Sequence, residues 1–242
     1  MSALVIEIPT IADTTLEVMK RVIDENEATQ KIQDENAGPI PLAQALSDFF
    51  QMASALESGA QQVASDGMSE IAHYALDLLD RLAHQLLVLD IHDQRERMAI
   101  IFVSMALWFA RRDAVLDNLS GTADGFANLV NGENDTTELA KLTLMIQEVL
   151  NAASAEMKKD LDRSDSWRPW RVLNLNSGIA ATRALDPDLM RNVFATLEQR
   201  LPDDLAGFFN DGRRRMKGQN IPDQVLAVME EFADKWPAGL PH

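Results

Sequence analysis

The sequence predicts an all-α protein in which antiparallel helical hairpins stack as a short irregular α-solenoid or pack as a multi-helix bundle. Apolar residues recur every three or four positions in one segment after another, which is the spacing of an amphipathic helix. Short polar breaks rich in glycine, proline, asparagine or aspartate separate these segments. Convincing strand patterns are almost absent, so a sheet is not expected.

The N-terminal region predicts one helix and then a domain boundary. Helical spacing begins at Asp13, a suitable N-cap, and the segment turns polar over 25–35. Over 34–41, charged residues, a glycine and two prolines follow, and this composition ends a helix and favours extended backbone. We therefore expect an acidic N-terminal segment with one helix at 1–36 and a helical-hairpin domain at 37–242.

Four helices are expected in the first part of the hairpin domain. The helix expected at about 93–110 is apolar on nearly every side, so it should be covered on both flanks and its Trp108 should lie in the interior. The helix expected at about 115–131 carries Gly121 and Gly125 four residues apart, where another helix is expected to approach closely. The expected ranges are about 42–56, closed around Asp66 and Gly67, then from Ser69 to about 89, 93–110 and 115–131.

Five further helices are expected in the second part. Asp135 with Glu138 three residues later resembles a capping box, and helical spacing continues from there to Lys158 and Lys159. Pairs of proline and aspartate open three of the later helices. The expected ranges are about 135–159, 168–184, 187–200, 203–216 and 222–235.

The helix starts near 93, 135, 168 and 203 are separated by 42, 33 and 35 residues, close to the repeat lengths of helical-hairpin arrays. In this respect the region from about 69 to 235 resembles tetratricopeptide-like helical repeats, which implies stacked hairpins with a concave groove. The stretch 167–183 is similar to a segment of bacterial helical proteins with no assigned function, and this resemblance implies no activity.

Composition narrows the classes of function. The chain has 242 residues and no cysteine, which excludes cysteine zinc sites, disulfides, iron–sulfur clusters and thiol nucleophiles. A net charge of −16 argues against nucleic-acid binding. The charge is uneven, because residues 1–66 hold eleven acids and three bases whereas residues 163–217 hold seven acids and ten bases. A homo-oligomer in which these parts attract each other is therefore one expectation.

A soluble cytoplasmic location fits the sequence best. The N-terminus lacks the basic region and cleavage site of a secretory signal, and cysteine is absent. The longest apolar run, Met98 to Ala110, is thirteen residues, which is too short to cross a bilayer. No membrane association and no cofactor are expected.

The stretch 167–183 carries a candidate ligand site. On a helix, Arg171, Asn174 and Gly178 share one ridge, where the arginine can grip a carboxylate, the asparagine can orient it and the glycine leaves room. The other interpretation is that these polar groups cap neighbouring helices. The candidate residues for an anionic ligand are Trp170, Arg171, Asn174, Asn176 and Arg183.

A candidate metal site lies on the helix that begins near Ser69. His73, Asp77, Asp80 and His84 project from one helical face, and imidazole with carboxylate can bind zinc, nickel or a di-iron pair. The other interpretation is a solvated face, because the same arc lies opposite the apolar stripe. The cluster at 213–217 is basic and indicates either a phosphate contact or a favourable last turn of a helix.

The function that the sequence favours is non-catalytic protein or peptide binding. A stacked helical array offers a concave groove, whereas no nucleophile elbow, zinc-protease or phosphate-loop motif occurs. The alternative is a small-molecule-binding protein or an enzyme that takes an anionic ligand near Trp170, Arg171 and Asn174.

Overall fold

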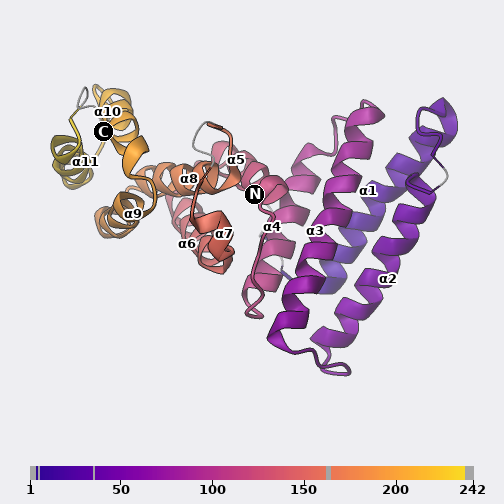
Figure 1. Cartoon of the computed structure of the whole chain (residues 1–242). Coiled ribbons are helices and arrows are strands. Elements are labelled where there is room, and N and C mark those ends of the chain that lie inside the picture. Colours follow the sequence, from indigo (N-terminus) through magenta and orange to yellow (C-terminus); the bar gives the residue numbers. More distant parts are fainter. Residues whose placement is uncertain (1–3, 5, 35, 162–164, 238–242) are drawn as a thin grey trace.

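The computed structural model describes residues 4, 6–34, 36–161 and 165–237, and in this part the chain is all-α, as predicted (Figure 1). Its only β-type pairing there is an isolated bridge between Leu116 and Ala153. The helices are α1 (Ile8–Thr29), α2 (Pro39–Glu57), α3 (Ser65–Val88), α4 (Arg95–Ala110), α5 (Ser120–Gly132), α6 (Thr136–Ala152), α7 (Ala155–Lys158), α8 (Pro169–Arg183), α9 (Pro187–Arg200), the 3-10 turn η1 (Pro202–Asp204), α10 (Leu205–Met216) and α11 (Asp223–Lys235).

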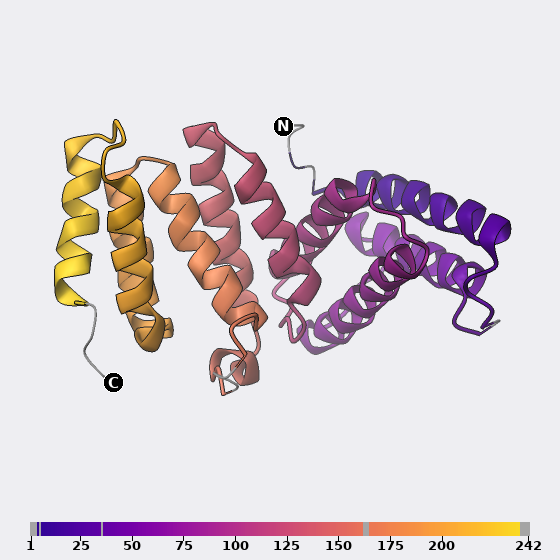
Figure 2. The same ribbon diagram turned by 90° about the horizontal axis from the view of Figure 1, so that it is seen from above.

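The helices form two arrangements that join at α4 and α5. At one end α1 packs on α2 and α4, while α3 packs on α2 and α4, which makes a bundle. From α5 onwards the helices lie side by side in a row, in which α6 and α9 pack on α8 and α11 packs on α10 (Figure 2). The axes of this row run steeply across those of α1 to α3, so the long contact between α4 and α5 is also where the direction changes.

The first two helices begin earlier than predicted. Helix α1 begins at Ile8, with Pro9 in its first turn, rather than at Asp13. Helix α2 begins at Pro39, so the second proline, Pro41, also lies in its first turn. Proline suits these positions because the first N–H groups of a helix have no intrahelical acceptor. The division into segments 1–36 and 37–242 stays a prediction.

Two other boundaries differ for identifiable reasons. Asp66 and Gly67 belong to the first turn of α3, which begins at Ser65, instead of closing α2. Helix α6 ends at Ala152, before the predicted Lys159, because the next residue leaves the helix to form the bridge with Leu116. The predicted N-cap of α6 is confirmed, since the carboxylate of Asp135 accepts hydrogen bonds from the backbone N–H groups of Thr137 and Glu138.

The expectation that Trp108 of α4 lies in the interior is confirmed. Trp108 is fully buried, and its indole N–H donates to Glu57 Oε1 at 3.0 Å, which ties α4 to the end of α2. The guanidinium of Arg112 lies 4.0 Å from the centre of the same ring. Within the described residues, no helix combines the length and the apolar character that a membrane span requires.

Candidate functional site

A groove of about 430 Å³ lies where α3, α4 and α5 meet, at the junction of the bundle and the row. Its floor is apolar, and its rim is polar except for Leu87. The floor contains Leu86, Ile91, Met98 and Phe102, and the rim contains Asp80, Leu87, His92, Arg95, Asp124 and Asn128.

Two glycines shape the groove by bringing α5 onto α4. A Cβ atom on Gly121 would lie 2.3 Å from the Phe102 ring, and one on Gly125 would lie 2.9 Å from the Ala99 carbonyl oxygen. The close helix approach predicted at these glycines is therefore confirmed. Because α4 and α5 are antiparallel, Asn128, one turn after Gly125, lies toward Arg95 near the start of α4.

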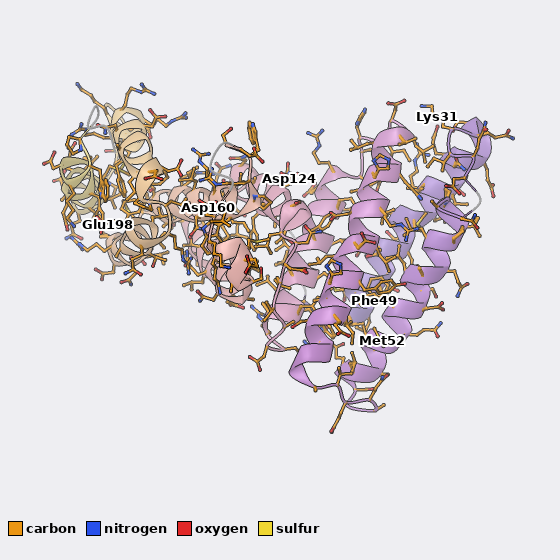
Figure 3. The ribbon with its side chains drawn as sticks, viewed as in Figure 1. Lys31, Phe49, Met52, Asp124, Asp160 and Glu198 are labelled. Atoms are coloured by element: carbon orange, nitrogen blue, oxygen red, sulfur yellow. The ribbon has the colours of Figure 1, made fainter. Side chains whose placement is uncertain are left out.

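The two ends of the groove differ in charge, because Asp80 and Asp124 border one end and Arg95 lies toward the other. Asp80 on α3 and Asp124 on α5 interact electrostatically, so two carboxylates from different helices border one end. Figure 3 shows Asp124 on α5, on the side of the row that adjoins the bundle. Leu87 borders the groove about two turns along α3 from Asp80, and its side chain is 66% exposed. An apolar surface with an acidic end can hold a positively charged group beside an apolar one.

The environment of Asp80 disfavours its charged form. Burial raises the pKa of Asp80, and the nearby charges of Asp77 and Asp124 raise it further. A hydrogen bond of 2.6 Å from the Asn118 side-chain amide opposes this shift without cancelling it. The pKa therefore lies above the ordinary value of 3.8. A cationic group bound beside Asp80 would favour its ionised form, which makes this carboxylate a candidate binding residue.

We expect Asp80→Asn to stabilise the protein at neutral pH. A raised pKa means that ionising Asp80 requires more free energy in the folded state than in the unfolded chain, so ionisation destabilises the fold. This cost is absent at pH values below 3.8, grows as the pH rises through the pKa of the folded state and is complete above it. Urea unfolding at a series of pH values should show a gain for Asp80→Asn that shrinks toward zero in acid. Asp188→Asn, which changes an exposed side chain of α9, should show no such gain, and a gain for Asp80→Asn that does not depend on pH would contradict this explanation.

The structure does not gather the four predicted metal ligands. His73 Nδ1 lies 3.1 Å from Asp117 Oδ1, and Asp80 accepts from Asn118, so two of the four side chains contact the segment before α5. Asp77 and His84 are exposed on the same helix. Across the described ranges, no group of three or more His, Cys, Asp or Glu side chains is arranged to hold a metal ion.

The predicted ligand residues on α8 mostly contact their own chain. Arg171 does grip a carboxylate, but it is that of Asp204, which accepts from Nε at 2.6 Å. The Asn174 amide donates to the Trp170 carbonyl oxygen at 2.8 Å, and its side-chain oxygen accepts from Arg200 at 3.3 Å. These contacts fit the interpretation that α8 is held by its polar groups.

The remaining residues of that prediction are also placed. A Cβ atom on Gly178 would lie 2.5 Å from the Phe208 ring, so the room expected beside this glycine is filled. Arg183 donates to the carbonyl oxygens of Val130 and Glu133 at the end of α5, which makes it a helix-terminus contact. Asn176 is half-buried on α8.

The basic cluster lies in the last turn of α10, as one interpretation predicted. Arg213 contacts Glu230 at 3.4 Å and Asp234 at 3.5 Å on α11, and Arg214 pairs with Asp211 at 2.8 Å. Arg213 therefore joins α10 to α11, and both arginines favour the carbonyl end of α10.

The groove was not predictable from the sequence pattern, because its residues come from three helices and the segments between them. Asp124 stands between the two glycines that were expected to meet another helix, and that position was the available signal. Comparison of the chain with protein-family models, with curated proteins and with solved structures finds no match. The fold and the groove together define an all-α protein of packed helices with an apolar groove that has two carboxylates at one end.

Proposed function

We propose that the protein is a non-catalytic protein- or peptide-binding helical-repeat protein, and that its groove takes a short segment with a lysine or arginine next to apolar residues. The observation that carries this proposal is the apolar floor between α4 and α5, bordered at one end by Asp80 and Asp124. A cationic side chain would receive charge-assisted hydrogen bonds from these carboxylates while its apolar neighbours cover Leu87, Met98 and Phe102.

Size and charge support a short basic segment. A volume of about 430 Å³ lies within the range of ligand sites and admits a few side chains rather than a folded domain. The net charge of −16 raises the encounter rate of a basic partner. We also propose that the helices resemble tetratricopeptide-like repeats and those of bacterial helical proteins. In the same proposal, the protein is cytoplasmic and can form a homo-oligomer.

Selection from a random peptide display library against the whole protein tests this function. Enriched peptides should carry a lysine or arginine within two or three residues of a large apolar residue. The double variant Asp80→Asn/Asp124→Asn should bind the enriched peptides at least about tenfold more weakly, because each charge-assisted hydrogen bond contributes about 1.5–3 kcal/mol.

The variants separate binding from folding. Asp80→Asn is expected to stabilise the fold, so weaker peptide binding by the double variant cannot come from unfolding. Asp211→Asn removes one negative charge on α10, outside the groove, and should leave peptide affinity unchanged. Enriched peptides without a cationic residue, or equal affinity for the parent and the double variant, would refute the proposed site.

A further inference from the structure

Arg200, the last residue of α9, is a half-buried cation whose acceptors among the described residues are all neutral. Its Nη1 donates to Gln147 Oε1 at 3.1 Å and to Asn174 Oδ1 at 3.3 Å, and its Nη2 donates to Asn151 Oδ1 at 2.9 Å. All three acceptors are neutral amides, and within the described residues no carboxylate pairs with this guanidinium. Its Nε–H group donates to no acceptor among the described residues, so this group can still form a hydrogen bond.

A second cation lies close to the first. The Lys158 ammonium donates to the Asn151 carbonyl oxygen at 2.7 Å, and the Asn151 side chain contacts Arg200. Burial lowers the pKa of Arg200. Burial and then the charge of Arg200 lower the pKa of Lys158. The fold therefore holds two positive charges near each other at a cost, and a bound anion would remove that cost.

A buried donor in the same place has no acceptor. Trp170 is only 3% exposed, and its indole Nε1 has no hydrogen-bond partner among the described residues. The guanidinium carbon of Arg200 lies 5.4 Å from the centre of the Trp170 rings. Buried N–H groups nearly always have a partner, so one without an acceptor in the described residues, beside a cation that has no carboxylate partner there, points to a missing acceptor.

Neighbouring arginines show that the lack of a counter-charge is local. Arg171 pairs with Asp204, and Arg168 pairs with Asp160 and Asp204. Both arginines flank Trp170 in the sequence, at the start of α8. Carboxylates thus lie near the start of α8, from Asp160 after α7 and from Asp204 in η1, whereas the acceptors that Arg200 finds among the described residues are all amides.

We propose that Arg200, Lys158 and the indole N–H of Trp170 form a binding site for a phosphate group, separate from the groove and independent of the peptide-binding function. Arg200 and Lys158 would supply two positive charges, and Trp170 would supply a neutral donor. Gln147, Asn151 and Asn174 would keep the guanidinium in position. Phosphate is the favoured anion because it carries about 1.5 to 2 negative charges at neutral pH, which matches two cations better than a monoanion does.

Titration of the whole protein with inorganic phosphate at constant ionic strength tests the site, with the indole N–H signals of the four tryptophans as the readout. Trp170→Phe identifies the Trp170 signal. We expect this signal to move and saturate with phosphate while those of the other tryptophans stay. Acetate should bind at least about tenfold more weakly, since it balances only one of the two charges.

Two variants and one control complete the test. Arg200→Gln, which keeps an amide donor toward Asn174, should abolish the saturable shift. Lys158→Gln lies on the surface, where it cannot unfold the core, and should weaken phosphate binding about tenfold. Arg191→Gln removes an exposed cation elsewhere on α9 and should change nothing. A Trp170 signal that does not respond, equal binding of acetate, or an unchanged phosphate affinity in Lys158→Gln would overturn the proposal.

Discussion

Replacing Trp108 with alanine should destabilise the protein by about 3–5 kcal/mol, the range for truncating a large aromatic residue in a core. The side chain is fully buried on α4 and packs edge-on against Phe109, with ring centres 5.0 Å apart. Its loss leaves a cavity and also leaves Glu57 without the indole donor at 3.0 Å. Urea unfolding followed by circular dichroism measures this change.

Trp167 provides the matched control for this prediction. It is 82% exposed just before α8, so Trp167→Ala removes the same side chain without opening a cavity. Its effect should stay within about 0.5 kcal/mol. Equal stability of the Trp108→Ala variant and the parent would mean that α4 is peripheral, contrary to its place between the bundle and the row.

Asp160→Asn should be the second most damaging substitution, with a loss near the lower end of about 3–5 kcal/mol. Asp160 and Arg168 are both largely buried, and the carboxylate accepts from two nitrogens of the guanidinium, Nη2 at 2.9 Å being one of them. Without the charge on Asp160, Arg168 retains the carboxylate of Asp204 at 3.5 Å and the carbonyl oxygen of Asp165 at 2.9 Å. Asparagine tolerates the left-handed backbone at this position, where φ is 49°, so the change tests charge rather than strain. Figure 3 places Asp160 beside α7 and α8.

An exposed ion pair shows the contrast with Asp160. Asp211→Asn breaks the pair between Asp211 and Arg214 on α10, whose side chains are mostly in solvent, and should cost about 0–1 kcal/mol. Thermal unfolding of both variants in parallel measures the difference. Equal losses would show that the contact between Asp160 and Arg168 is no stronger than a surface pair.

Local sequence signals predicted most of the fold. Helix α9 has the predicted range 187–200, and the Asp135 cap operates as expected, because propensity and capping act within one helix. Proline was the ambiguous signal, since it can end a helix or open one, and at Pro39 it opens α2. The early end of α6 depends on pairing with Leu116, a contact that no local pattern contains.

Far less of the candidate site was predictable. The ridge of Arg171 and Asn174 was placed correctly on α8, but Arg171 finds its carboxylate in Asp204, which sequence periodicity cannot pair with it. Asp80 was singled out for metal binding, whereas its near neighbour in space is Asp124 on another helix. Such sites depend on which helices meet, and a single sequence leaves that open.

Binding of the most enriched library peptide, followed by NMR of methyl-labelled protein, tests the central claim most directly. The account predicts that the methyl signals of Leu86, Leu87, Ile91 and Met98 shift with the peptide, and that Asp80→Asn/Asp124→Asn removes these shifts at equal peptide concentration. Shifts confined to α9–α11, for example at Val225, Val228 and Met229, with those of the groove unchanged, would contradict it.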